Sequence, residues 1–227
     1  MQKNVQTIPL PLPFGMGRVN CYLAQTGSGF ILVDTGGSNA RKDLLKALQC
    51  SGCEPGKLPL IFITHGDFDH AGNAAFLRQA FGSQIAMHKD DVGMVEDGDM
   101  FHNRQKPNFI VRKLAGLYAN SGKKDRFTPD LLLEDGKNLS EYGWDARILS
   151  IPGHSKGSVG LLTASGDLFC GDLLVSTKKP MLNSLMDDPA AGNASLQKLV
   201  DSGAQRVFPG HGEPFAISML QEVDHAQ

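Results

Sequence analysis

The chain has 227 residues, 41% of them hydrophobic, and its 22 basic residues nearly balance 24 acidic ones, giving a formal net charge of -2. This composition is typical of a globular protein long enough to bury a sizeable core, and it excludes a disordered chain. The near-neutral charge gives no support to general binding of nucleic acids or membrane surfaces.

Targeting and membrane segments are not evident in the sequence. The first ten residues lack the apolar core of a signal peptide, and no apolar run approaches the roughly 20 residues of a membrane span. The four cysteines are too few and too scattered for a disulfide framework, which fits a reducing compartment. We therefore predict a cytoplasmic protein.

The first predicted elements are two short apolar strands, 20–23 and 30–33, separated by a glycine-containing polar turn that favours a β-hairpin. The second strand ends at Asp34. This aspartate either caps the following turn or supports a metal ligand from behind. An amphipathic helix is predicted over 40–48.

The next stretch, 58–73, carries the strongest chemical signal. An apolar strand over 58–64 leads directly into two histidines and two further acids: His65, Asp67, Asp69 and His70. Carboxylates so close together repel one another, and a bound cation removes that conflict. Zinc, iron and manganese all accept histidine nitrogen and aspartate oxygen, so the cluster predicts a metal without naming it. The alternative is a solvated polar loop before the helix predicted at 74–80.

The middle of the chain changes character. A strand over 84–87 ends at His88, and 90–130 then shows polar turns and apolar residues at partly helical spacing. Seven basic residues against two acidic ones give 101–130 a local charge of about +5. This helical insertion is either a cap over a functional site or an ordinary solvated segment.

Strands return in the second half, over 146–151, 158–163, 167–172 and 206–208, with a helix over 194–202. Three potential ligands each follow or end one of these strands beside a glycine: His154, Asp172 and His211. The repeated placement indicates one shared site. Strands on both sides of a helical middle suggest two packed sheets with helices outside.

These motifs as a set resemble the metallo-β-lactamase superfamily, and the resemblance covers nearly the whole chain. They are Asp34-Thr-Gly36, the cluster from His65 to His70, Gly153-His154-Ser155, Gly171-Asp172 and Gly210-His211-Gly212. The resemblance implies an α/β fold, an αββα four-layer sandwich of two mixed sheets with outer helices. It also implies a single domain over 1–227 with a helical insertion at about 90–130.

The family cluster usually reads His-x-His-x-Asp-His, and this chain has Asp67 at the second histidine position. By position, the resemblance implies that metal site 1 uses His65, Asp67 and His154. Site 2 would use Asp69, His70 and His211. Asp172 would bridge the two sites, and Asp69 and Asp172 would be the catalytic residues.

The exchange of histidine for Asp67 affects the metals that the resemblance implies. Two divalent ions are expected, with zinc first and iron or manganese possible at the Asp67 site, since flavodiiron relatives also carry a carboxylate there. Asp67 brings the summed charge of two ions, three carboxylates and a hydroxide to zero. Site 1 is therefore expected to bind zinc more weakly than site 2, and Asp67→His to tighten it.

The resemblance implies a hydrolase that directs a metal-bound hydroxide at an ester, thioester, lactone or phosphodiester. The substrate is expected to be a small molecule, and the basic segment favours an anionic one. A di-iron redox or oxygen-handling protein with a separate electron donor is one alternative; a non-catalytic metal- or ligand-binding module is another. No nucleic acid or membrane partner is expected, and a homodimer stays open. His88, His102 and His225 are expected to be dispensable.

Overall fold

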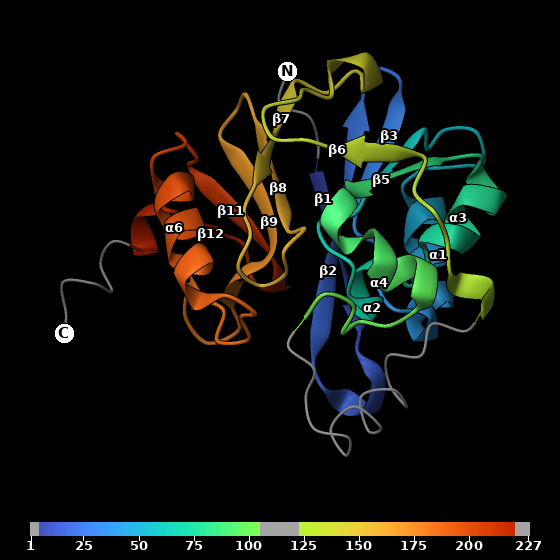
Figure 1. Ribbon diagram of the computed structural model, residues 1–227. Helices are drawn as coiled ribbons and strands as arrows, with labels where there is room; N and C mark the ends of the chain where they lie inside the picture. Colours follow the sequence, from blue (N-terminus) through green and yellow to red (C-terminus); the bar gives the residue numbers. More distant parts are fainter. Residues whose placement is uncertain (1–4, 105–122, 221–227) are drawn as a thin grey trace.

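The computed structural model describes residues 5–104 and 123–220, which form two mixed β-sheets with helices on their outer faces (Figure 1). The first sheet has the strand order β1-β2-β3-β4-β5-β6. Its strands are β1 (Val5–Pro11), β2 (Arg18–Thr26), β3 (Gly29–Val33), β4 (Leu60–Phe62), β5 (Gln84–His88) and β6 (Leu131–Leu133). The pairs from β1 to β3 are antiparallel, and those from β3 to β6 are parallel.

The second sheet has the order β12-β11-β9-β8-β7, and β10 pairs with β9 beside this path. Its strands are β7 (Ala146–Ser150), β8 (Val159–Thr163), β9 (Asp167–Ser176), β10 (Met181–Leu182), β11 (Arg206–Gly212) and β12 (Phe215–Ala216). Only β9 and β11 pair in parallel. Both sheets are therefore mixed, as the sequence predicts.

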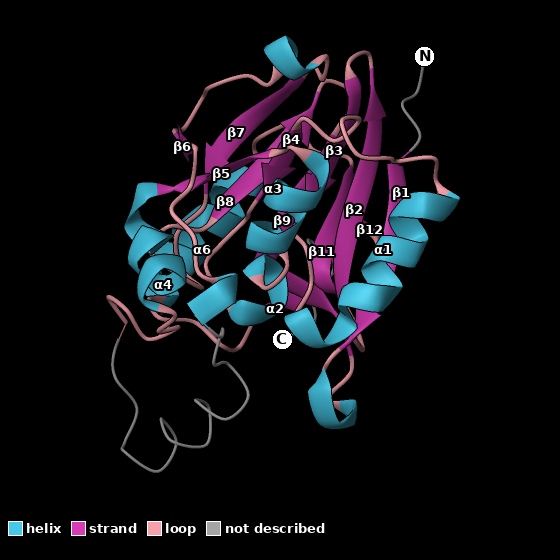
Figure 2. Cartoon of the chain, turned by 90° about the vertical axis from the view of Figure 1, so that its right-hand side faces the viewer, coloured by secondary structure: helices cyan, strands magenta, loops and turns pink. Residues whose placement is uncertain are grey.

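Within 5–104 and 123–220, the α-helices are α1 (Arg41–Cys50), α2 (Phe68–Ala71), α3 (Ala74–Phe81), α4 (Val92–Asp97) and α6 (Pro189–Val200). Short 3₁₀ turns occur at η1 (Pro13–Gly15), η2 (Ser38–Ala40), η3 (Lys89–Asp91), η4 (Lys123–Asp125) and η5 (Ser140–Tyr142). Helices α1 and α3 cover the outer face of the first sheet, as Figure 2 shows, and α6 covers that of the second (Figure 1). The layers run helix, sheet, sheet, helix.

Alternation along the strands explains why both faces of each sheet are buried. In β3, Phe30 and Leu32 pack under the outer helices, whereas Ile31 and Val33 pack between the sheets. Successive strand side chains point to opposite faces, so a continuous apolar run fills two layers of core. Three clusters result: one below α1 and α3, one between the sheets and one below α6. The predicted αββα sandwich is confirmed.

The predicted helical insertion at 90–130 lies partly outside the described residues. Its described ends contain η3, α4 and the turns up to residue 104, followed by η4. From the first of these ends, Arg104 contacts the predicted ligand Asp67, and Asp91 contacts residues beside His65 and His154. The first end of this segment therefore lies against the candidate site.

Candidate metal centre

The structure brings the seven predicted ligands together from five places in the fold. The loop from β4 to α2 supplies two, α2 supplies two, and the second sheet and its loops supply three. They are His65, Asp67, Asp69, His70, His154, Asp172 and His211, which we call the metal centre. Its chemistry is that of four imidazoles and three carboxylates.

Site 2 is compact. One potential ligand atom from each of Asp69, His70 and His211 lies within 4.8 Å of the others. The Oδ2 atom of Asp69 is 3.5 Å from Nε2 of His211 and 3.9 Å from Nε2 of His70. Three ligand atoms so disposed can surround one cation.

Site 1 is built from His65 and His154, with Asp172 completing a group whose ligand atoms lie within 4.8 Å of one another. Asp67 also reaches this group. Its Oδ2 atom lies 3.0 Å from Nε2 of His154 and 3.4 Å from Nε2 of His65. The shorter aspartate side chain thus points one oxygen at the position that a histidine would serve.

Asp172 lies between the two groups. Its carboxylate oxygens are 3.2 Å from Nε2 of both His70 and His211, and 3.9 Å from Nε2 of His154. One carboxylate therefore faces histidines of both sites. This position is the one that a bridging ligand requires.

Glycines allow these strands to come so close. A Cβ atom on Gly171 would lie 2.6 Å from Oγ1 of Thr64, and one on Gly210 would collide with the Asp172 carboxylate and the His70 ring. Neither contact can be relieved by moving the far end of a flexible side chain. Glycine beside Asp172 and His211 is therefore a packing requirement of the metal centre.

The donor atoms fit a bound cation. Nε2 of His65, Nε2 of His70 and Oδ1 of Asp172 are buried and make no hydrogen bond within the described part of the chain. The last two lie 3.2 Å apart without hydrogen-bond alignment. Buried polar atoms are rarely left without partners, and a metal ion at their common focus would satisfy all three.

Each histidine is oriented by a contact at its other ring nitrogen. Nδ1 of His154 lies 2.7 Å from the Leu185 carbonyl, and Nδ1 of His211 lies 2.7 Å from the Arg18 carbonyl. A carbonyl only accepts hydrogen bonds, so these Nδ1 atoms carry the proton. In the neutral ring, Nε2 then presents its lone pair to the metal centre.

Of the two roles that the sequence left open for Asp34, its contacts support the second, holding a metal ligand from behind. Its carboxylate accepts hydrogen bonds from the Thr64 amide at 2.8 Å and from Oγ1 of Thr64 at 2.7 Å. It also lies 2.8 Å from Nδ1 of His70. Asp34 thereby shapes the strand end and holds a site 2 ligand, in a left-handed backbone conformation with φ of 57°.

Asp34→Asn is expected to weaken metal binding at site 2 by roughly 10- to 100-fold. Asparagine tolerates the left-handed conformation, but its NH₂ group would face Nδ1 of His70 and move the ring proton to Nε2. That tautomer cannot bind a metal. Zinc titration of the metal-free protein measures the change, with exposed Asp43→Asn on α1 as the control. Unchanged affinity would show that Asp34 serves only to hold Thr64 at the end of β4.

The electrostatics of the centre couple its acids and bases. Burial lowers the pKa of His70, but Asp172 and Asp34 outweigh burial and leave that pKa well above its usual value. Burial is likewise outweighed at His211, where Asp172 and Asp69 raise the pKa to about 10. The pKa of Asp172 falls well below its usual range because His70 and His211 overcome the effect of burial.

Arg104 is a member of the site that sequence reasoning missed. Its Nη1 atom donates to Oδ1 of Asp67 at 2.6 Å, and its Nε atom lies 2.7 Å from a carboxylate oxygen of Asp187. Burial raises the pKa of Asp67, but Arg104 and the neighbouring histidines outweigh it and hold that pKa well below its usual range. The only signal in the sequence is the basic character of the surrounding segment.

Asp91 is a second residue that the sequence did not indicate. Its buried carboxylate accepts hydrogen bonds from the amides of Gly66 and Gly157, at 3.0 and 2.8 Å, and from Oγ of Ser155 at 2.6 Å. These partners flank His65 and His154. Asp91 therefore fastens together the two loops that carry the histidines of site 1.

The remaining histidines stand apart from the two ligand groups. Nδ1 of His88 accepts a hydrogen bond from the amide of Asp90, and His102 pairs with Asp97 at 3.1 Å. Neither belongs to a potential metal-binding group among the described residues. His225 lies outside those residues. That all three are dispensable stays a prediction.

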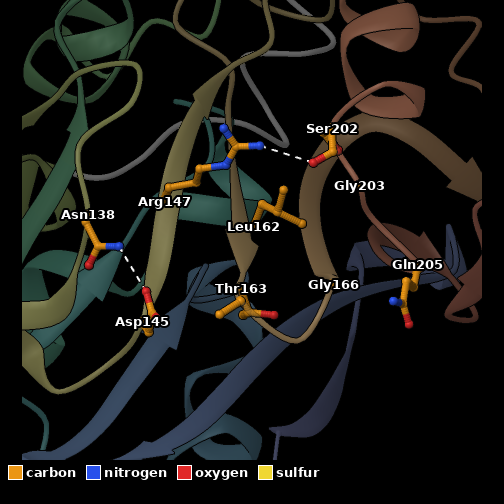
Figure 3. Close-up of a pocket in the computed structure, with 10 residues that line it drawn as sticks. Asn138, Asp145, Arg147, Leu162, Thr163, Gly166, Ser202, Gly203 and Gln205 are labelled. Atoms are coloured by element: carbon orange, nitrogen blue, oxygen red, sulfur yellow. Dashed lines mark hydrogen bonds between the residues drawn. The ribbon is translucent and has the colours of Figure 1, made fainter.

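A separate polar pocket of about 280 Å³ lies at the other end of the second sheet (Figure 3). It is formed where β8 ends and β9 begins, and Arg147 and Thr163 line it. Arg147 is already engaged there, donating to the Ser202 carbonyl at 3.1 Å. None of the seven ligands lines this pocket, so it is not part of the metal centre.

The fold and the metal centre together define an αββα protein of the metallo-hydrolase type. The model of the metallo-beta-lactamase superfamily matches residues 14–211, and the chain belongs to that superfamily. Its members bind two divalent metal ions. No helix in the described ranges is long and apolar enough to cross a membrane.

Individual relatives are similar over most of the chain. The probable metallo-hydrolase YqjP of Bacillus subtilis is 27% identical, with 93% of this chain and 72% of the relative covered. The human acyl-coenzyme A thioesterase MBLAC2 is 27% identical, with 89% and 76% covered.

Solved structures show the same fold. A metallo-beta-lactamase family protein of Thermus thermophilus has a TM-score of 0.75 and 25% identity, with 97% of this chain and 78% of that chain covered. TTHA1623 in a di-iron-bound form has a TM-score of 0.67 and 30% identity, with 92% and 95% covered.

Proposed function

We propose that this protein is a dinuclear metal-dependent hydrolase of small ester-type substrates, with thioesters as the first class to test. The observation that carries the proposal is the convergence of buried, unpaired donor atoms from His65, His70 and Asp172 on one centre. The likeness to a thioesterase and to a probable metallo-hydrolase supports the reaction class. Lactones and phosphodiesters share the same chemistry.

Divalent ions held by sites 1 and 2 would supply Lewis acidity toward a carbonyl or phosphoryl oxygen and would acidify water. The chain's own residues set the conditions for that chemistry. Asp69 and His211 are the most exposed ligands, with 13% and 17% of their side chains accessible. The Asp69 carboxylate is therefore best placed to orient an attacking water and to accept its proton.

Zinc is the proposed metal, since it accepts the imidazole and carboxylate donors of both sites. A di-iron redox protein is the second candidate, and two observations favour it. TTHA1623, which is 30% identical to this chain, has been solved in a di-iron-bound form, and Asp67 adds a carboxylate to site 1. Elemental analysis of protein purified without added metal separates the two candidates.

A substrate panel on zinc-reconstituted protein is expected to show hydrolysis that is lost with a chelator and restored by zinc. The panel contains an acyl-coenzyme A, an aryl ester, a lactone and an aryl phosphodiester. Because His102 lies outside both ligand groups, His102→Ala should keep its turnover. A protein that binds zinc yet hydrolyses none of the four would instead be a non-catalytic metal-binding module.

A further inference from the structure

Arg104 is almost completely enclosed beside site 1. Only 8% of its side chain is exposed. Besides Asp67 and Asp187, its guanidinium contacts the carbonyls of Met100 and His154, at 3.2 and 3.4 Å. The arginine is thus fixed from several directions, and its charge cannot swing away into solvent.

The two oxygens of the Asp67 carboxylate contact different partners. Its Oδ1 atom accepts the short hydrogen bond from Arg104, while its Oδ2 atom faces His65 and His154. A carboxylate and a guanidinium so paired sum to zero charge. The Asp67–Arg104 pair is therefore as neutral as a histidine at position 67 would be. A sum over the metal ligands alone leaves out the charge of Arg104.

The position of the Arg104 charge matters as much as the summed charge of the site. A cation at site 1 must share Asp67 with Arg104 and is repelled by a fixed positive charge only one carboxylate away. Site 2 has no such neighbour in the ion pairs of the described residues, where Asp69 pairs only with His70 and His211. The two sites therefore differ in their electrostatics even though both contain two histidines.

We propose that Arg104 is a positioning residue that holds Asp67 by one oxygen and makes site 1 the weaker metal site. Site 2 then fills first, and site 1 fills only at higher metal concentration. The protein passes through a state with one metal ion and the Asp67–Arg104 pair intact. The proposal rests on the metal centre of the proposed function, but on no particular substrate or reaction.

The proposal changes what substitution of Asp67 should do. From the sequence, Asp67→His is expected to tighten zinc at site 1. With Arg104 in place, the new imidazole would stand beside a buried arginine that has lost one of its two carboxylates. Asp67→His alone should therefore fail to tighten zinc, whereas Asp67→His combined with Arg104→Gln should succeed, in a strongly non-additive cycle.

The test is titration of zinc into the metal-free protein in competition with a chromophoric chelator, at constant pH. Arg104→Gln is expected to tighten site 1 by about tenfold or more, since it removes the repulsion between a unit and a double charge. Arg104→Lys keeps the charge and should stay within about threefold of the natural protein. Site 2 should change little in either variant.

Arg206→Gln is the matched control. Arg206 pairs with the buried carboxylate of Asp167 at 2.8 Å, at the opposite end of β9 from the metal centre. Removing it deletes an arginine, itself 48% exposed, from a buried carboxylate without touching site 1. Both zinc affinities should therefore equal those of the natural protein.

Loss of Arg104 leaves Asp67 unpaired, so the metal-free variant is expected to be less stable. Zinc can replace the missing cation, and saturating zinc should raise Tm more in Arg104→Gln than in the natural protein. If Arg104→Gln does not fold without metal, the comparison of Asp67→His with the double variant, refolded with zinc, decides the question.

Unchanged or weaker zinc binding at site 1 in folded Arg104→Gln would overturn the proposal, as would tighter zinc in Asp67→His alone. These readouts do not involve turnover. A protein that binds zinc as expected but hydrolyses nothing would refute the proposed function and leave the role of Arg104 standing. A protein that binds no zinc would refute both.

Discussion

Asp172→Asn is expected to remove hydrolysis, lowering turnover by roughly a thousandfold, and to reduce metal content at both sites while the protein stays folded. The Asp172 carboxylate lies 3.2 Å from Nε2 of His70 and of His211 and faces His154 as well. An amide of nearly the same shape carries no charge, and its NH₂ group would point at imidazole nitrogens that must bind metal. Elemental analysis and turnover on the best substrate of the panel measure the two losses.

Asp167→Asn provides the control on the same strand. Asp167 is also buried in β9, but it pairs with Arg206 at the far end. Its replacement should lower stability modestly and leave metal content and turnover unchanged. Full metal content and activity in Asp172→Asn would show that this residue lies between the ligand groups without serving either.

The fold was predictable because its sheets are built from continuous apolar runs with turn residues between them. Strands such as β3 and β8 bury both faces, so their sequences are apolar throughout. Strand β1 was missed because it contains Pro9 and Pro11. It is an edge strand that pairs only with β2, a position where proline costs no ladder hydrogen bond to a second neighbour.

The shortest strands and the beginning of a helix were also not indicated by the sequence. The strands β6, β10 and β12 are too short to show periodicity. Helix α6 begins at Pro189 and not near Ala194, because the Asp188 side chain accepts a hydrogen bond from the Ala191 amide at its first turn. An N-terminal cap of this kind can be recognised in a sequence, but only if a helix start is looked for at that position.

The candidate ligands were predictable for a different reason. His65 and His154 follow strands β4 and β7, whereas Asp172 and His211 lie within β9 and β11, which run past their predicted ends at 172 and 208. Neighbouring strands bring such residues together in space. Asp91 and Arg104 gave no such signal, because they act on residues far away in sequence through tertiary packing alone. From the sequence, the basic segment 101–130 favours an anionic substrate. Arg104 weakens that interpretation, because this side chain pairs with Asp67 and Asp187 and is not free to attract an anion.

Metal binding is also expected to release protons at pH 7. In the metal-free protein, both nitrogens of His70 lie near carboxylates, those of Asp34 and Asp172, which raise the pKa of the ring well above its usual value despite its burial. Asp67, with Asp172, also raises the pKa of His154 despite its burial, and the pKa of His211 is raised to about 10. Each ring must lose its proton before its Nε2 atom can bind a metal.

The sign of the pH dependence follows from these shifts. Raised histidine pKa values stabilise the metal-free fold below about pH 6.5, and this contribution is lost as pH rises toward 10. Asp67 and Asp172 have lowered pKa values, so they are already ionised at neutral pH and release nothing. Metal affinity should therefore climb steeply with pH, by about tenfold per pH unit for each proton released. As the pH rises, the metal-free protein should therefore lose stability, whereas the zinc-loaded protein should gain it.

Calorimetric zinc titration at pH 7 in two buffers of different ionisation enthalpy counts the protons directly. Thermal unfolding between pH 6 and pH 9, with and without zinc, tests the opposite trends in stability. Asp34→Asn should release fewer protons than the natural protein, because His70 then lacks one of the two carboxylates that hold it charged. Release of no protons would mean that the histidines are neutral before the metal binds. The carboxylates of the centre would then stabilise the metal ion and not protonated imidazole rings.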